Sequence, residues 1–330
     1  MVLEQGVLVI GEISDDHLSP NTAELLSAAV QLSRSSSTPV TVALIGEQLE
    51  AVTQEAIAVG ADKVYTVVDA LLSSEQPDLF VAAYEAVCKA VNPDIILIGR
   101  TALGRELAPR LASRLGVSVI QDCLEVSLDP ATGQLTGLRP VYGGNVLARI
   151  RCNKTPQIAT LRPKAYAPQT PDGNRQGEVI TVVVSLAADM IRSKVLKEEI
   201  DHTHGVRLED ARVVISGGRG LGGPEPFAEL QELAGLLEAG IGASRAAVDA
   251  GWAPGNWQIG LTGKTITPEL YITVGISGAS QHMAGCSSAK VIVAINKDRE
   301  ANIFRSARYG VVGDWETAVP AFIQAVRDLS

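Results

Sequence analysis

The sequence predicts an α/β protein of two domains, each built on a mainly parallel, doubly wound sheet. Short apolar segments rich in Val and Ile alternate with segments whose apolar residues recur at helical spacing. This alternation stops midway and starts again in the last third of the chain. The composition agrees, because aromatic residues are only 4 % of the 330 residues whereas glycine, which suits strand-to-helix turns, occurs 31 times.

In the first half, four segments have the apolar, β-branched character of strands that are buried on both faces. Three segments with helical periodicity lie between them, and Asn21 and Asp78 stand at positions typical of N-caps. This order predicts a parallel sheet with helices on both faces. The expected strands are VLVIG (7–11), PVTVALIG (39–46), KVYTVV (63–68) and DIILIGR (94–100), and the expected helices span 21–35, 49–60 and 78–91.

The middle of the chain has a different pattern. Residues 117–152 show little helical periodicity and carry turn signals at DPATG and YGG, which predicts a hairpin or meander appended to the first sheet. Residues 162–178 are polar and rich in proline, as expected of an exposed loop.

A charged segment, residues 190–211, separates the two regular regions. We therefore place the domain boundary near residue 205, with one domain over residues 1–205 and the other over residues 206–330. His202 and His204 form an H-x-H pair in this linker. Such a pair is usually solvated when no third metal ligand is near, so no metal site is expected.

The second domain begins with the strand 211–216, followed by GGRGLGG and a helix. Pro320 fits the last helix only in its first turn, so that helix is expected to start near Thr317. The further expected elements are the helix 226–240, the strands 270–274, 290–296 and 309–314, and the last helix up to residue 329.

Composition and charge exclude several classes of function. The net charge of −9 argues against nucleic acid as a partner, because proteins that bind it usually present a basic face. The four cysteines form no C-x-x-C pair, so we expect them to be reduced and mostly structural. The N-terminus lacks a signal-like segment and no apolar run approaches the ~20 residues that span a bilayer. We therefore expect a cytoplasmic protein, or an already trimmed form, without membrane insertion.

Glycines and polar residues follow several strands of the second domain. The strand 211–216 leads into GGRG, the strand 270–274 leads into GISGASQH, and the last two strands end at Asn296 and Asp314. Taken singly, these residues also suit turns and caps. Because ligands bind outside the carboxyl ends of parallel strands, their coincidence at one edge predicts a shared nucleotide pocket.

Other motifs are weaker. GRGLGG (218–223) fits G-x-G-x-x-G, but two prolines follow it and delay the helix. GLTGKT (260–265) is not a P-loop, because Gln258 stands where the first glycine is required, so NTP hydrolysis is not expected. No nucleophile motif is present, and His282 and Cys286 are not expected to form a catalytic pair.

Several long motifs lie close together in residues 210–325. PELYITVGISGASQHMAG (268–285) is accompanied by SGGRG, GASRAAVDAGW, LTGK, AINKD and YGVVGD. In sequence, order and spacing this set resembles the alpha subunit of electron transfer flavoproteins, the FixB family. The resemblance is looser over the first domain.

The resemblance implies a Rossmann-like FAD-binding domain over residues 206–330 and a nucleotide-hydrolase-like interface domain over residues 1–205. It implies a heterodimer with a beta subunit and an electron carrier without catalytic residues of its own. Electrons would come from flavoprotein dehydrogenases, such as the acyl-CoA dehydrogenases of fatty acid β-oxidation. They would pass to a downstream quinone reductase or another acceptor.

Carried over position by position, the resemblance also implies the residues that bind the FAD. The flavin would be met by Arg219, Ser244, Arg245, Ile259, Gly260, Leu261, Thr262 and His282, the pyrophosphate and ribityl region by Ser277, Gly278, Ala279, Ser280 and Gln281, and the adenosine end by Asn296, Asp314 and Trp315.

Gly278 of this set and the nearby Gly275 would expose backbone N–H groups to the pyrophosphate. The resemblance implies His282 close to the flavin O2, and either His282 or Arg245 would supply positive charge near the reduced flavin. The chain departs from the family at Leu261, where a glutamine is usual, and at Ser280, where an aliphatic residue is common. Either change could shift the flavin potential.

Two alternatives stay open at this stage. One is a subunit of an electron-bifurcating flavoprotein that oxidises NADH, with a second FAD in the beta subunit where a simple carrier would hold AMP. The other is an NAD-binding enzyme of a related parallel-sheet fold, which flavin absorbance would exclude.

Overall fold

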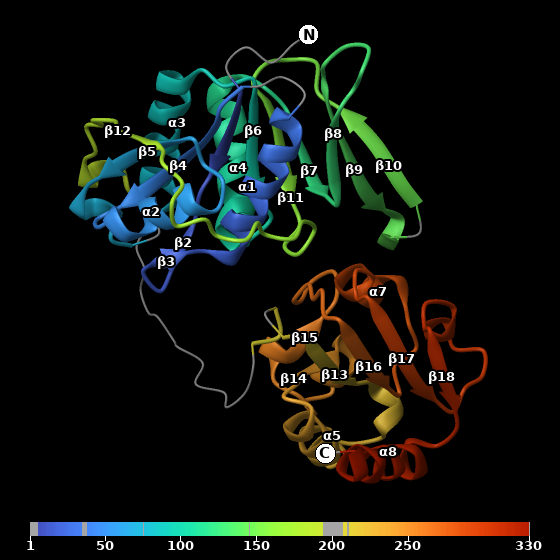
Figure 1. Cartoon of the computed structure of the whole chain (residues 1–330). Helices are drawn as coiled ribbons and strands as arrows, with labels where there is room; N and C mark the ends of the chain where they lie inside the picture. Colours follow the sequence, from blue (N-terminus) through green and yellow to red (C-terminus); the bar gives the residue numbers. More distant parts are fainter. Residues whose placement is uncertain are drawn as a thin grey trace. The chain divides into compact units, whose positions relative to one another are not determined.

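The computed structural model describes residues 6–34, 38–74, 76–144, 146–193, 207–209 and 211–329 (Figure 1). The chain divides into two compact units. One comprises Met1–Pro140 and Leu147–Glu198, and the other comprises Val141–Val146 and Glu199–Ser330. The boundary that we expected near residue 205 lies outside the described residues, as do His202 and His204.

The first unit is built on a seven-stranded sheet in which every pair of neighbouring strands is parallel. The strand order is β12-β5-β4-β1-β6-β11-β7. Its strands are β1 (Val7–Ile10), β4 (Val40–Gly46), β5 (Lys63–Val68), β6 (Ile95–Gly99), β7 (Val119–Cys123), β11 (Gln157–Leu161) and β12 (Glu178–Thr181).

Helices cover both faces of this sheet, as the apolar strands predict. α1 (Pro20–Ser33) and α2 (Glu50–Ala58) bury one face, and α3 (Pro77–Val91) and α4 (Ala102–Leu115) bury the other. The expected N-caps are wrong for α1 and α3. Each helix starts at a proline, the residue best suited to the first helical position, so the caps are Ser19 and Gln76 instead of Asn21 and Asp78.

The expected meander is present. β8 (Glu125–Leu128), β9 (Leu135–Val141) and β10 (Val146–Arg151) form a separate three-stranded sheet, in which β8 and β9 are antiparallel. However, β7 from the start of this region belongs to the main sheet instead. The remaining small elements are β2 (Ile13–Ser14), β3 (His17–Leu18), η1 (Ala70–Leu72), η2 (Tyr142–Gly144) and η3 (Ala188–Met190).

The second unit is built on a six-stranded, fully parallel sheet of order β15-β14-β13-β16-β17-β18. Numbered along the chain, this is 3-2-1-4-5-6, the order of a Rossmann sheet. Its strands are β13 (Val213–Gly217), β14 (Gly240–Ser244), β15 (Gln258–Ile259), β16 (Leu270–Val274), β17 (Val291–Asn296) and β18 (Tyr309–Val312).

Two apolar clusters fill the two faces of this sheet. One lies under α5 (Phe227–Leu236), α6 (Arg245–Asp249) and α8 (Trp315–Leu329), and the other under α7 (Ser280–Cys286) and η6 (Asn302–Arg305). Figure 1 shows α5 and α8 together and α7 on the opposite side of the strands. The short helices η4 (Arg219–Leu221) and η5 (Gly255–Trp257) complete the unit.

The last helix differs from the prediction. α8 starts at Trp315, not near Thr317, so Pro320 lies inside it. The proline removes only one backbone donor near the start of an amphipathic helix whose Val319 and Ile323 are buried, and the helix tolerates this loss.

Candidate functional site

The strand order of the second unit reverses between β13 and β16, and the loops that leave these two strands lie against each other. Gly218 donates its N–H to Val274 O (2.8 Å), and Gly220 donates to Gly275 O (3.0 Å). In open α/β sheets, the crevice at such a reversal is the usual ligand site. The carboxyl edge of this sheet is therefore the place to look for function.

Glycines allow these loops to approach closely. Gly275 has φ +67° and Gly278 has φ +77°, which side chains rarely adopt. A Cβ on Gly275 would lie 2.8 Å from the Gly220 carbonyl carbon, and a Cβ on Gly278 would lie 2.3 Å from Ile303 N. The expectation that Gly275 exposes its N–H is wrong, because that N–H donates to Ile295 O (2.9 Å).

The segment after this turn leaves its backbone donors unused. Across the part of the chain that the structure describes, the N–H groups of residues 277–281 have no protein acceptor, and the first that is engaged is that of His282. α7 begins without a side-chain cap, since its N-cap is Ala279. Successive unpaired N–H groups of this kind form a cradle for an anion such as a phosphate.

The loop after β15 forms a second wall beside α7. Leu261 donates its N–H to Gln281 O (2.7 Å), and Gly260, at φ +146°, has room only for hydrogen because Gln281 O lies 2.9 Å from its Cβ position. Leu261 is 70 % exposed, and the exposed Thr262 accepts a hydrogen bond from Gln258 Nε2 (3.0 Å). Ile259 is buried in the core, so only its backbone can face a ligand.

The ends of β13 and β14 contribute two exposed cations. Arg219 lies in η4, and Arg245 starts α6, with its Nε 3.3 Å from Asp249 Oδ2 in an exposed pair. Such a pair is worth little, so the Arg245 guanidinium can turn to another anion. The hydroxyl of Ser244 is already engaged, because it caps α6 by accepting from Ala247 N (3.4 Å).

His282 lies at the core side of α7 and is only 7 % exposed. Its Nε2 is 2.7 Å from the hydroxyl of Tyr271, whereas its Nδ1 has no hydrogen-bond partner. Burial lowers the pKa of His282 to about 4, and the neighbouring Ile259 carbonyl opposes this only in part. His282 is therefore neutral near pH 7, and the expectation that it could supply positive charge is not supported.

The far end of the edge is formed by β17 and β18. Asn296 donates from Nδ2 to Ile276 O (2.9 Å) and accepts from Asp298 N (2.9 Å), so its amide already joins two loops. Asp314 accepts from Glu316 N (3.2 Å) and caps α8. Trp315 is half-buried against the core, and Asp314 is exposed.

The predicted site residues therefore lie along one edge of one sheet. Five interstrand spacings separate the six strands, which gives an edge of ~24 Å, long enough for an extended dinucleotide. The unpaired N–H groups lie at the reversal of strand order, with Arg245 and Thr262 toward one end and Asp314 toward the other.

Comparisons with known proteins agree with this geometry. A family model described as the electron transfer flavoprotein domain matches residues 7–187, and one described as the electron transfer flavoprotein FAD-binding domain matches residues 207–287. The chain belongs to the electron transfer flavoprotein alpha-subunit family. FAD is the cofactor that this family's second domain indicates, and an alpha subunit implies a beta-subunit partner.

Relatives align over almost the whole chain. The electron transfer flavoprotein subunit alpha of Thermoanaerobacterium thermosaccharolyticum is 40 % identical over 324 residues, which cover 98 % of both chains. That of Bacillus subtilis is 41 % identical over 325 residues, again 98 % of both chains. The protein FixB of Azorhizobium caulinodans is 38 % identical over 326 residues, 97 % of this chain and 88 % of its own.

The residues present fit FAD. The cradle of N–H groups suits the pyrophosphate, and the unpartnered Nδ1 of the buried His282 is a polar atom that a ligand can satisfy. In the described residues no cluster suits a metal ion. Cys286 is buried and donates from Sγ to His282 O (3.4 Å), and burial raises its thiol pKa to about 12, so it offers no nucleophile.

The sequence reasoning missed Tyr271. The signal was present, because a tyrosine inside a buried strand must find a partner for its hydroxyl. It lies eleven positions before the histidine that it contacts, and only the fold of the loop between them brings the two together.

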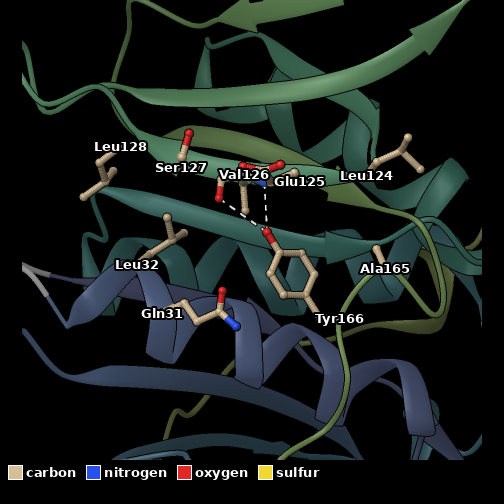
Figure 2. A pocket seen from close by; sticks show the side chains of 9 residues that line it. All are labelled: Gln31, Leu32, Leu124, Glu125, Val126, Ser127, Leu128, Ala165 and Tyr166. Carbon is tan, nitrogen blue, oxygen red and sulfur yellow. Dashed lines mark hydrogen bonds between the residues drawn. The ribbon is translucent and has the colours of Figure 1, made fainter. Parts of the chain in front are cut away.

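The first unit has a hollow of about 510 Å³ between α1 and β8, bordered by Gln31 and Leu32 on the helix side. Figure 2 shows that Tyr166 reaches across it to Val126, whose N–H donates to the Tyr166 hydroxyl (2.9 Å). The hydroxyl in turn donates to Val126 O (3.3 Å), so its polar capacity is used by the edge of β8. We assign no function to this hollow.

No helix among the described residues is long and apolar enough to cross a membrane.

Proposed function

We propose that this chain is the FAD-binding alpha subunit of a heterodimeric, cytoplasmic electron carrier. The observation that carries the proposal is the row of unpaired N–H groups over residues 277–281 at the reversal of strand order in the second unit. Backbone donors bind phosphate without adding net charge. An anionic cofactor can therefore be held by its phosphates, while other residues contact its redox-active ring.

Each part of the edge has a separate task. The N–H groups of residues 277–281 hold the pyrophosphate, and Asp314 accepts from adenosine hydroxyls with the oxygen that does not cap α8, with Asn296 and Trp315 as neighbours. The loop 259–262 lines the isoalloxazine, with Thr262 beside it. Arg219, Ser244 and Arg245 border the flavin and its phosphates.

FAD supplies, when bound, the capacity to accept and release electrons singly or in pairs. The residues of this chain do not perform acid–base chemistry on a substrate. Arg245 favours the reduced flavin by its positive charge, and the exposed Leu261 gives the ring an apolar contact that a solvated edge would lack. The donors in this scheme are flavoprotein dehydrogenases, with acyl-CoA dehydrogenases as the first class to test, and the acceptor is a quinone reductase or a similar protein.

The beta subunit is required because the flavin site in this unit is an open edge. Leu261, Thr262 and Arg245 are all exposed in this chain, and a partner surface is needed to exclude water from the flavin. Obligate interfaces of this kind usually bury more than ~2,000 Å². The β8–β10 sheet, which exposes Val146 and Leu147, is suited to such an interface.

The test is to express the chain alone and together with a beta-type chain, and to measure bound flavin and electron transfer from a reduced acyl-CoA dehydrogenase. We expect FAD to be retained only in the heterodimer. A soluble, monomeric, FAD-saturated chain with full electron-transfer activity would contradict the partner. A heterodimer that binds NAD but never flavin would overturn the FAD proposal in favour of an NAD-dependent enzyme.

The same preparation separates a simple carrier from an electron-bifurcating one. One FAD with AMP per heterodimer indicates a carrier, and two FAD with NADH oxidation indicate bifurcation. The second FAD of a bifurcating form would lie in the beta subunit, so the flavin count of the heterodimer is the measurement that decides.

A further inference from the structure

Tyr271 and His282 form a buried polar pair beneath the proposed FAD site. Tyr271 lies on β16 with no exposed surface, and its hydroxyl is 2.7 Å from His282 Nε2. The two rings are stacked, with centroids 6.1 Å apart and an interplanar angle of 24°. The phenol and the imidazole are thus fixed relative to each other by packing as well as by the hydrogen bond.

The direction of this hydrogen bond follows from which atoms have partners. Burial raises the pKa of Tyr271 well above its usual range, so the phenol keeps its proton. Burial lowers the pKa of His282, so the imidazole is neutral and carries one proton. The pair therefore has two protons, and only one of them can lie between the two side chains.

Two arrangements are possible. If the phenol donates to Nε2, the imidazole proton lies on Nδ1, and one donor is left for a ligand. If Nε2 instead donates to the phenol oxygen, the Nδ1 lone pair has no partner, and the phenol proton has only the nearby Ser216 hydroxyl, which makes no hydrogen bond in the structure. A buried unpaired polar group costs about 1–3 kcal/mol, so the first arrangement is favoured. The Ile259 carbonyl near the ring also favours a proton on it, although Nδ1 makes no hydrogen bond in the structure.

We propose that Tyr271 is a positioning residue that holds His282 in the tautomer with its proton on Nδ1, so that a neutral N–H donor faces an acceptor atom of the bound FAD. This inference rests on the proposed function, because it takes FAD as the ligand at this edge. It adds a role for a residue that has no contact of its own with the site. It also explains why Nδ1 is the atom of this pair that the protein leaves unpartnered.

The first experiment needs no variant. The histidines of the chain are labelled with ¹⁵N in the heterodimer, and the ring nitrogen shifts of His282 are recorded with FAD bound and after its removal. We expect the protonated-type shift on Nδ1 and the unprotonated-type shift on Nε2 in both states. A proton on Nε2 in both states would overturn the inference.

The second experiment uses Tyr271→Phe, which removes only the hydroxyl. We expect His282 to shift toward the tautomer with its proton on Nε2, and the reduced flavin to become about tenfold less favoured, equivalent to ~30 mV for a two-electron couple. The matched control is Tyr84→Phe, which deletes another buried hydroxyl, one that donates to Gly11 O (2.6 Å) in the first unit. It should leave both the tautomer and the flavin equilibrium unchanged.

The two proposals fail in different ways. If Tyr271→Phe retains one FAD per heterodimer but leaves the tautomer and the flavin equilibrium as they were, the role of Tyr271 is refuted and the proposed function stands. If the unmodified heterodimer retains no FAD, the proposed function is refuted first. A variant that does not fold leaves the tautomer measurement on the unmodified protein to decide.

Discussion

The chain contains two doubly wound parallel sheets, and each has a point where the strand order reverses. In the second unit the reversal lies between β13 and β16, and in the first it lies between β1 and β6. Both positions are where such folds usually bind ligands. The one in the second unit leaves the longer row of unpaired backbone donors, residues 277–281, and the reason can be read from individual side chains.

In the first unit the protein itself occupies the reversal point. Glu12, two residues after β1, accepts from Thr101 Oγ1 (2.6 Å), and its own N–H donates to Thr22 Oγ1 (2.8 Å). The helices that follow β1 and β6 are both capped by side chains, α1 by Ser19 and α4 by Thr101. The caps thus engage the N–H groups of Thr22 and Gly104 and leave a shorter row of donors, residues 101–103, beside the carboxylate of Glu12.

In the second unit the corresponding helix α7 has no side-chain cap, and glycines let neighbouring backbone fill the space where side chains would be. The comparison shows that the reversal of strand order gives the place of a possible binding site but does not by itself make that site bind a ligand. We infer that binding depends on how many of the loop's N–H groups the caps leave free and on whether a carboxylate lies beside them.

The substitution with the largest expected effect on FAD binding is Gly278→Val. The residue has φ +77°, and a Cβ there would lie 2.3 Å from Ile303 N, so the loop must move and the row of N–H groups with it. We expect FAD affinity of the heterodimer to fall more than 100-fold, about 3 kcal/mol. Equilibrium dialysis measures it.

The control is Gly235→Ala in α5, where the Cβ position has no neighbour within 4 Å. Alanine should stabilise that helix by about 0.5–1 kcal/mol and leave FAD affinity unchanged. Undiminished FAD affinity in Gly278→Val would show that the backbone row is not the binding element.

The second prediction concerns charge. Arg245→Ala should lower the FAD potential by on the order of 100 mV, about 2 kcal/mol for one electron, because a cation beside the reduced flavin is lost. Arg245→Lys should keep part of the effect, although it loses the planar fork. Redox titration of the heterodimer decides the point.

Arg327→Ala serves as the matched control, since Arg327 is a cation of the same unit that pairs with Glu232 at 2.8 Å near the other end of α8. Its removal should leave the potential unchanged. An unchanged or raised FAD potential in Arg245→Ala would show that Arg245 does not lie beside the flavin.

Much of this comparison could be predicted from the sequence, and the failures have a common physical cause. The apolar strands β4 and β6 were predicted correctly, because a run of β-branched residues buried on both faces has few alternatives. β11, β12, β14 and β15 were missed. β15 has only two residues, β14 is rich in glycine and alanine, and β11 and β12 carry polar residues, so their strand character comes from pairing with neighbours that the local sequence does not reveal.

The site shows the same division. That the carboxyl edge binds a nucleotide followed from glycines and polar strand endings, but which donors are free did not. Gly275 was expected to expose its N–H and instead pairs with β17, and His282 was considered as a cation and is buried. Hydrogen-bond partners and burial are tertiary facts, and residue spacing does not determine them.

The third prediction is a pH dependence of stability. The folded pKa of His282, about 4, lies below its ordinary value of 6.5, so the unfolded chain binds the proton more readily. The stabilisation is therefore complete above pH 6.5 and is lost as the pH falls toward 4. Between pH 7 and pH 5 the loss should be about 2 kcal/mol.

Denaturant unfolding of the unmodified chain and of His282→Gln at both pH values isolates this contribution. The buried neighbours Tyr271 and Cys286 keep their protons throughout this range, because burial raises both pKa values. The variant should lose ~2 kcal/mol less than the unmodified chain over the same interval. Equal losses would mean that His282 is not the group responsible.

The fourth prediction separates the two roles of Asp314. Serine keeps an N-cap for α8 but lacks the second carboxylate oxygen, whereas alanine loses both. Asp314→Ser should weaken FAD retention by about 1 kcal/mol without a change in the flavin spectrum, and Asp314→Ala should add a loss of about 1 kcal/mol in helix stability. Full retention of FAD by Asp314→Ser through dialysis would leave Asp314 only its capping role.

The smallest expected effect is in the first unit and tests the other half of the comparison. Glu12→Gln removes the negative charge at the reversal between β1 and β6 but keeps an oxygen that can accept from Thr101. If a row of three donors is too short to hold a nucleotide, the variant should bind neither FAD nor AMP there, and stability should change by less than ~1 kcal/mol. Calorimetric titration of the heterodimer with each nucleotide, with the second unit already saturated, measures this directly. Micromolar binding by the variant would instead show that the negative charge of Glu12 alone had excluded a nucleotide. The two sheets would then differ mainly in this carboxylate, and less in the use of their backbone donors.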